Sequence, residues 1–240
     1  MKFMSLLKTS EHPLDPSPFL RFLQQVLIRD GRTDFNLFQQ QDACEILSCI
    51  LNELCGESLL ASHAINIHVR NSVTCNTCFG NNLQEDLCKI LQLPVSNSIQ
   101  ESIDSFLNPE DLNGSNMYFC NSCSSLQPAI LEHEFSDIGS CVIIQLKRFV
   151  HFRSSVSKDI KAVSCNNQIR IPIVVDTDII SHKNFKLVAS INHSGSLERG
   201  HYTALINSCS SWFHYNDAAV IKSKQSVPAD LCYILFYKAV

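Results

Sequence analysis

The chain has 240 residues, of which 45% are hydrophobic, and its formal net charge is −4 at pH 7. This length and apolar content suit one large or two small domains with a buried core and exclude a disordered chain. The acidic balance excludes a typical nucleic-acid-binding domain, which needs a basic surface for phosphate contacts. No apolar run approaches the roughly 20 residues of a membrane-spanning helix, and the N-terminus lacks the apolar core of a secretory signal. We therefore expect an intracellular protein of the cytoplasm or nucleus, without a nucleic-acid or membrane partner.

The first part of the chain has the pattern of helices. Apolar residues at helical spacing start beside Pro18 and end at Gly31, which predicts a first helix between them. A second helix is expected from about residue 40 to residue 54, and Gly56 is placed to end it. Further on, Ser98 and Glu101 have the spacing of a capping box, which predicts a short helix through residue 107.

After Gly139 the pattern changes to runs of β-branched and aromatic residues separated by Ser, Asn, Gly or Pro. These runs cover residues 141–150, 185–192, 201–206 and 231–237. The polar segment 153–161 has no periodic pattern and is expected to be a surface loop. Helices followed by a mainly antiparallel sheet make an α+β fold.

Four of the twelve cysteines form two pairs with a spacing of three residues. The pairs are Cys75 with Cys78 and Cys120 with Cys123, and each lies in a small polar segment that suits a tight turn. Two such turns point four sulfur atoms at one ion, which is the arrangement of a structural zinc site. The alternative is four unliganded thiols. Residues 79–119 separate the pairs, so an inserted helix or strands must connect them.

The remaining cysteines are expected to be reduced, because a chain without an export signal belongs to a compartment where disulfides are rare. Most lie singly among apolar residues, where a thiol packs as a small hydrophobic side chain. This expectation covers Cys44, Cys49, Cys55, Cys88, Cys141 and Cys232.

One histidine has suitable partners for proton transfer. His201 begins a predicted strand, and Asn216 and Asp217 follow the next predicted strand. A hairpin folds the start of its first strand back beside the end of its second, so we expect His201 near Asn216. An oriented imidazole suits acid–base chemistry near neutral pH, although the spacing alone also fits an ordinary surface histidine. The histidines without a comparable partner are expected to be structural: His133, His151, His193 and His214.

The order of several motifs resembles the catalytic domain of ubiquitin-specific proteases, the cysteine peptidases that cleave ubiquitin from its conjugates. The motifs are QQDACEIL at 40–47, the two cysteine pairs, IQLKRF at 144–149, INHSGSL at 191–197, GHYTA at 200–204, WFHYND at 212–217 and YILFY at 233–237. The resemblance covers residues 19–237. It implies a papain-like, hand-shaped fold with an incomplete helical thumb at about 1–60 and with zinc-bearing fingers and an antiparallel palm at about 61–240. Residues 1–240 would then be a single partial domain.

The resemblance also implies roles for individual residues. By position, His201 matches the general base, Asn216 the residue that orients it, and Asp217 an assisting acidic residue. Asp42 matches an acidic position that engages the arginine-containing tail of ubiquitin, and guanidinium groups pair with carboxylates in a two-pronged geometry. The loop 194–200 matches a mobile loop over that tail. Ubiquitin, ubiquitinated proteins and a structural zinc at the four paired cysteines are therefore the expected partners.

The nucleophile of the family lies in a Gly-Asn-Thr-Cys segment that opens a helix, where the thiol pKa is lowered. We find no such segment in this sequence. Cys44 lies inside the motif at 40–47, and Cys209 lies in the hairpin between His201 and Asn216, so neither is well placed. Two explanations follow: a truncated product of a gene for a complete protease, which retention of His201 and Asn216 favours, or a pseudoprotease that binds ubiquitin. A weaker third hypothesis is a zinc-stabilised interaction domain without a ubiquitin connection.

Overall fold

The computed structural model describes residues 15–29, 31, 40–152, 155–176, 179–196, 199–208, 210–224 and 227–240. The chain divides into two compact units, Met1–Glu57 and Ser58–Val240. In the described residues, no helix is long and apolar enough to cross a membrane.

The first unit contains two described helices, α2 (Ser17–Arg29) and α3 (Ala43–Glu57). Helix α2 ends before Gly31, which has a positive φ of 80° as the prediction requires. Helix α3 runs through Gly56, so the prediction that this glycine ends the helix is wrong. The chain instead leaves the helix at Ser58, which is extended and caps the next helix, α4 (Leu59–Ile65).

Four strands of the second unit form the finger sheet, with the order β2-β1-β7-β4 and antiparallel pairing throughout. The strands are β1 (Ile67–Cys75), β2 (Asn81–Cys88), β4 (Glu110–Leu112) and β7 (Ala129–Ile138). Strands therefore begin well before Gly139, where the sequence pattern placed the first of them. Strand β2 escaped prediction because it is exposed along almost its full length and its residues are mostly polar.

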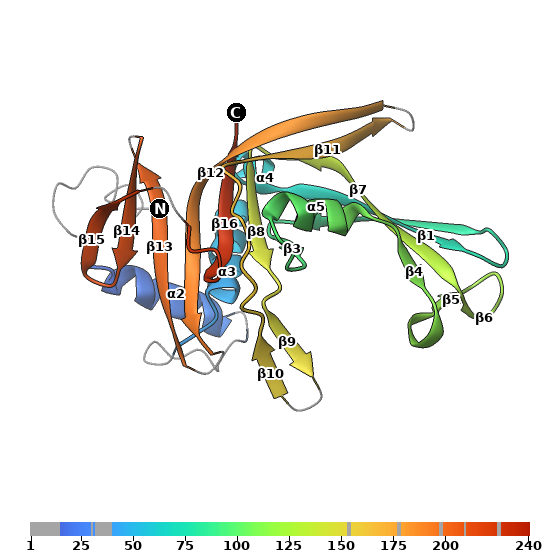
Figure 1. Cartoon of the computed structure of the whole chain (residues 1–240), viewed down its shortest axis with the longest axis horizontal. Helices are drawn as coiled ribbons and strands as arrows, with labels where there is room; N and C mark the ends of the chain where they lie inside the picture. Colours follow the sequence, from blue (N-terminus) through green and yellow to red (C-terminus); the bar gives the residue numbers. More distant parts are fainter. Residues whose placement is uncertain are drawn as a thin grey trace. The chain divides into compact units, whose positions relative to one another are not determined.

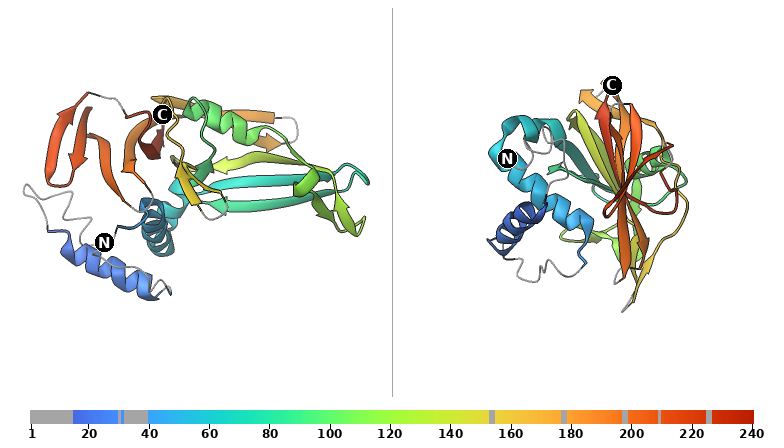
Figure 2. Two further views of the ribbon diagram at one scale, coloured as in Figure 1. Left: turned by 60° about the horizontal axis from the view of Figure 1, so that its bottom comes forward. Right: turned by 90° about the vertical axis from the view of Figure 1, so that its left-hand side faces the viewer.

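The larger palm sheet has eight strands, in the order β15-β14-β13-β12-β16-β8-β3 with β11 paired to β12. Its strands are β3 (Leu91–Leu93), β8 (Cys141–Leu146), β11 (Gln168–Asp176), β12 (Ile179–Gly195), β13 (Gly200–Ser208), β14 (Ser211–Asn216), β15 (Ala219–Ser223) and β16 (Cys232–Ala239). Among the described strands of this sheet, only β3 and β8 pair in parallel. The predicted α+β class with a mainly antiparallel sheet is confirmed. Figures 1 and 2 show the finger strands, in teal and green, extending away from the palm strands, in orange and red.

Three short structures complete the second unit. Strands β9 (Phe149–Phe152) and β10 (Ser155–Lys158) form an antiparallel hairpin, so the prediction of a loop over 153–161 is wrong for residues 155–158. Residues 153 and 154 lie outside the described residues. The short 3-10 helix η1 (Gly114–Asn116) is followed in the chain by strands β5 (Tyr118–Cys120) and β6 (Ser125–Gln127), which form an antiparallel pair.

Helix α5 (Ile99–Leu107) packs where the two sheets meet. Ser98 caps it by accepting a hydrogen bond from the Glu101 amide at 3.1 Å, as the capping-box prediction requires. The Glu101 carboxylate accepts from the Asn97 amide instead of returning to Ser98. Ile99 and Ile103 of α5 are buried in the same hydrophobic core as residues of the finger and palm sheets. The fingers and the palm therefore share one hydrophobic interior.

Candidate functional site

The hairpin of β13 and β14 brings the predicted histidine and asparagine together. Its register pairs Ser208 with Ser211 and Ala204 with Tyr215, so the end of β14 lies beside the start of β13. The Nε2 atom of His201 lies 2.7 Å from Oδ1 of Asn216. The predicted proximity of these two residues is therefore observed, whereas their catalytic roles stay a prediction.

This hydrogen bond determines which ring nitrogen of His201 carries a proton. With the amide oxygen of Asn216 as the acceptor, Nε2 must be the donor, so the neutral ring keeps a lone pair on Nδ1. Among the described residues, no other side chain hydrogen-bonds to the His201 ring. The His201 side chain is 45% exposed. Its Nδ1 is therefore able to accept a proton from a thiol or water brought to this surface.

Asp217 lies next to this pair without a hydrogen bond to it. Its Oδ2 is 3.9 Å from Nε2 of His201, and its side chain is 82% exposed. It has a positive φ of 50° in the tight turn that links Asn216 to Ala219. An exposed carboxylate at this distance stabilises a protonated imidazole only weakly, because water and salt screen it. The local geometry makes Asn216 the main orienting group.

A buried aromatic cluster, which the sequence analysis missed, supports the start of β13. His193 on β12 is 1% exposed, and its ring contacts Tyr202, Phe149 and Tyr233 with centroid distances of 4.7, 5.5 and 6.4 Å. Tyr202 directly follows His201 in the sequence. The cluster therefore holds the backbone that carries His201, and His193 is structural, as predicted.

Asp42 lies in the first unit, at the N-terminus of α3. Its Oδ1 accepts hydrogen bonds from the amides of Cys44 and Glu45, at 2.7 and 3.1 Å. A carboxylate in this position satisfies free amides and interacts favourably with the helix dipole. The capping role explains an acidic residue here on structural grounds, and its role towards a ubiquitin tail stays a prediction.

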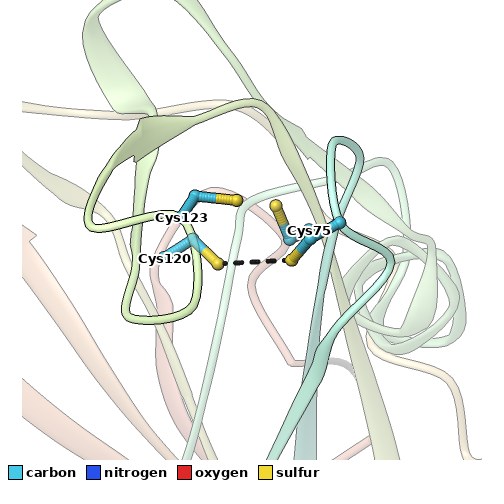
Figure 3. Close-up of side chains that lie close together, drawn as sticks. Cys75, Cys120 and Cys123 are labelled. Carbon is cyan, nitrogen blue, oxygen red and sulfur yellow. Dashed lines mark hydrogen bonds between the residues drawn. The ribbon is translucent and has the colours of Figure 1, made fainter.

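The four paired cysteines form a cluster at the end of the fingers. Their Sγ atoms all lie within 4.8 Å of one another, and those of Cys78 and Cys120 are 3.6 Å apart. In Figure 3 the sulfur atoms of Cys75, Cys120 and Cys123 face a common centre. The backbone amide of Cys78 donates to the Cys75 sulfur and lowers the pKa of Cys75 to about 7. The cluster could hold a metal ion.

Tight turns shape both halves of this cluster. The residues that follow each pair, Phe79 and Ser124, have positive φ values of 58° and 53°. The Phe79 amide donates to the Cys75 carbonyl oxygen, and the Ser124 amide to that of Asn121. In the first turn, the amide of Cys78 faces inward and stabilises the Cys75 thiolate. Between the pairs lie β2, β3, α5 and β4, as the long separation in sequence requires.

His133 was expected to lack a partner comparable to that of His201, and this part of the prediction is wrong. Its Nδ1 lies 2.6 Å from Oδ1 of Asn71, and its ring stacks on Phe106 at a centroid distance of 4.6 Å. Asn71 and His133 are paired across β1 and β7, which are far apart in the sequence. No local pattern could have indicated this contact. Burial lowers the pKa of His133, so the neutral ring is favoured.

No cysteine in the described part of the second unit hydrogen-bonds to the His201 ring. Cys209 lies outside the described residues. Cys44 is buried in helix α3, where burial raises its pKa to about 11, so its thiol stays protonated and unreactive. The expected packing role of Cys44 agrees with this environment.

The chain is similar in sequence to a known protein family. A family model described as ubiquitin carboxyl-terminal hydrolase matches residues 1–237. Ubiquitin carboxyl-terminal hydrolase 42 of Homo sapiens is 26% identical over 85% of this chain and 17% of the relative. Ubiquitin carboxyl-terminal hydrolase 8 of Saccharomyces cerevisiae is 26% identical over 83% of this chain and 50% of the relative. The chain thus spans half or less of the length of these curated relatives.

The fold also matches solved structures. In the SAGA Ubp8/Sgf11/Sus1/Sgf73 DUB module bound to ubiquitin aldehyde, one chain matches with a TM-score of 0.77 and 23% identity. The match covers 93% of this chain and 54% of that chain. These comparisons confirm the resemblance and the fold class that the ordered motifs predicted.

Proposed function

Because the chain belongs to the ubiquitin carboxyl-terminal hydrolase family, we propose that it acts on ubiquitin conjugates as the catalytic-base part of a cysteine-type deubiquitinase. The hydrogen bond of 2.7 Å between His201 and Asn216 carries this proposal. A binding protein needs no oriented imidazole with a free lone pair, whereas a thiol peptidase does.

In the proposed mechanism, His201 takes the proton of a nucleophilic thiol at Nδ1 and later gives it to the leaving amine. Asn216 holds the ring through Nε2 while its charge changes. Asp217 adds a weak, screened stabilisation of the imidazolium. None of the chain's own cysteines is assigned as the nucleophile.

Ubiquitin and ubiquitinated proteins are the proposed partners. The solved module with a similar fold is bound to ubiquitin aldehyde, and the relatives are named as ubiquitin hydrolases. Asp42 is proposed to pair with an arginine of the ubiquitin tail through the part of its carboxylate not used for capping. This assignment comes from its position in the family motif at 40–47.

We propose zinc as the metal of the four-cysteine cluster. Tetrahedral Zn–S bonds of about 2.3 Å place sulfur atoms about 3.8 Å apart, close to the spacing of 3.6 Å between Cys78 and Cys120. The ion would tie the β1–β2 turn to the β5–β6 turn, and its chemistry is structural because all four positions are filled by thiolates. A reducing compartment, cytoplasm or nucleus, would keep these thiols available.

The second candidate is an inactive domain that binds ubiquitin without cleaving it. It is favoured because no cysteine among the described residues of the second unit hydrogen-bonds to the His201 ring. A ubiquitin probe with a thiol-reactive C-terminus, added to the whole chain, tests whether the chain binds ubiquitin without a nucleophile of its own. Binding without a covalent adduct is expected, and an adduct would identify a nucleophile among the chain's own cysteines and overturn the assignment.

The transcript upstream of Met1 separates the two candidates. If it encodes a Gly-Asn-Thr-Cys segment in frame, the enzyme is supported, and the joined protein should cleave ubiquitin conjugates and lose this activity in a His201→Gln variant. If it encodes none, the enzyme hypothesis is rejected, and titration with ubiquitin then tests the inactive binding domain.

A further inference from the structure

The base of the β9–β10 hairpin is fixed by a buried arginine. Arg148, which directly precedes β9, is 0% exposed. Its guanidinium group donates to the backbone carbonyl oxygens of Asp159 and Lys161, both at 2.9 Å, just after β10. The Arg148 carbonyl oxygen accepts a hydrogen bond from the Asp159 amide at 2.6 Å. A guanidinium stays charged and presents its donors at fixed angles, so these bonds hold the two ends of the hairpin together.

Two residues at this base contact His193, and they are cross-strand partners. Phe149 pairs with Lys158 in the register of the hairpin. The Phe149 ring meets the His193 ring edge-on, with a centroid distance of 5.5 Å. The ammonium group of Lys158 donates a hydrogen bond to the backbone carbonyl oxygen of His193, at 2.5 Å. The hairpin therefore contacts His193 at both its side chain and its backbone.

The Lys158 side chain is partly withdrawn from water. It is only partly exposed, and burial is the main cause of its lowered pKa; the Arg148 charge adds to the shift and Asp230 opposes it. Within the described ranges, no carboxylate oxygen lies within 4.0 Å of the ammonium group. Hydrogen bonds from a charged donor are about twice as strong as neutral ones. The bond to the His193 carbonyl therefore restrains the backbone of β12 at this residue.

His193 lies directly opposite the start of β13. In the register of β12 and β13 it pairs with Tyr202, and Ser194 pairs with His201. The rings of His193 and Tyr202 are in contact, with a centroid distance of 4.7 Å. The His193 amide donates to the Leu231 carbonyl oxygen at 2.8 Å. A shift of the β12 backbone at His193 would therefore also shift the segment of β13 that carries His201.

We propose that Lys158 is a positioning residue for His201. Its ammonium group fixes the His193 carbonyl, and the β12–β13 ladder carries this restraint to the imidazole that bonds Asn216. The inference rests on the proposed function of His201 as a general base. Lys158 acts through the backbone of His193. Without its ammonium group, the end of β12 and the start of β13 open more often, and the His201 ring spends less time bonded to Asn216.

Nitrogen NMR of the whole, zinc-loaded chain tests the proposal with Lys158→Met and its control Lys161→Met. Methionine keeps an unbranched stem but donates no hydrogen bond, and the Lys161 side chain is exposed. Spectra are taken well above the ordinary histidine pKa of about 6.5, where the ring is neutral. Lys158→Met should give a mixture of the two neutral forms of His201, while Lys161→Met keeps the form protonated at Nε2. A wild-type pattern in Lys158→Met would overturn the proposal.

Amide hydrogen exchange separates positioning from a general loss of stability. In Lys158→Met, exchange in the β12–β13 ladder at residues 192–203 should be at least about tenfold faster, because a charge-assisted bond to that ladder is lost. The β1–β7 ladder of the fingers should keep its wild-type rates. Equal acceleration in both ladders would contradict the positioning role. Neither measurement involves ubiquitin, so the result on Lys158 does not depend on whether the chain acts on ubiquitin conjugates.

Discussion

Gly200 lies directly against the imidazole ring of His193, so that a Cβ atom at residue 200 would be 2.1 Å from Nε2 of His193. The ring is enclosed by Tyr202 and Phe149 and has little room to move away. Residue 200 immediately precedes His201. The absence of a side chain at this position therefore lets β13 start where His201 can reach Asn216.

A Gly200→Ala substitution should damage both stability and the candidate site. We expect the free energy of unfolding to fall by about 1 to 3 kcal/mol, because the added methyl group also meets the Ser194 carbonyl oxygen. Urea unfolding measures this change. Gly56→Ala is the control, since a Cβ there meets no atom within 4 Å in a helix and should leave stability equal or higher. Equal effects of the two substitutions would contradict the packing argument.

Removal of the Asn216 amide should release the His201 ring. In the folded chain, nitrogen NMR should find His201 mainly protonated at Nε2, and Asn216→Ala should give a mixture of the two neutral forms. Asp217→Asn should change this ratio little, because Asp217 lies 3.9 Å away and is exposed. The assignment of Asn216 as the orienting residue fails if the Asp217 variant has the larger effect.

Metal content should depend on the four clustered cysteines. We expect one zinc ion per chain, and a Cys120→Ser, Cys123→Ser double variant should lose it because two of four ligands are removed. Elemental analysis of the purified chain gives the stoichiometry. Cys141→Ser, outside the cluster, should keep the metal. A wild-type chain that binds no zinc would leave the cluster as unliganded thiols.

Stability should fall in mild acid partly through His133. Burial is the main cause of its lowered pKa; Glu110 opposes the shift and Lys147 adds to it. Because the folded pKa lies below the unfolded value of 6.5, the unfolded chain binds the proton first as the pH falls. The stabilisation is therefore present above that value and is lost as the pH falls through the folded pKa.

Urea unfolding between about pH 7 and pH 5 checks this expectation. His133→Phe keeps an aromatic ring against Phe106 but cannot titrate, so its stability should depend less on pH than that of the wild type. A His182→Gln variant, altered at an exposed histidine, is the control and should keep the wild-type slope. An unchanged slope in His133→Phe would exclude this residue as a source of acid sensitivity.

The parts of the structure that could be predicted depend on local signals. Helix α5 was predicted because Ser98 marks its N-terminus, and the hairpin of His201 and Asn216 because a polar turn separates two β-rich runs of similar length. The two cysteine turns are equally local. Their meeting was predicted only because one ion requires four ligands.

The parts that escaped prediction depend on contacts between distant segments. Asn71 meets His133 only because β1 pairs with β7, and no pattern near either residue indicates this. The five hydrogen bonds of Arg148 come from segments that converge only in the folded chain. Gly56 is a different failure, because the conformational freedom of glycine permits a helix end without requiring one.

Calorimetric titration of the zinc-loaded, folded chain with ubiquitin tests the central claim most directly. The account predicts saturable binding. It also predicts affinity at least about tenfold weaker for ubiquitin without its arginine-containing tail, since a charge-assisted pair contributes about 1.5 to 3 kcal/mol. Asp42→Ala should reduce this difference. A cooperatively folded chain that shows no saturable binding to ubiquitin would contradict the account.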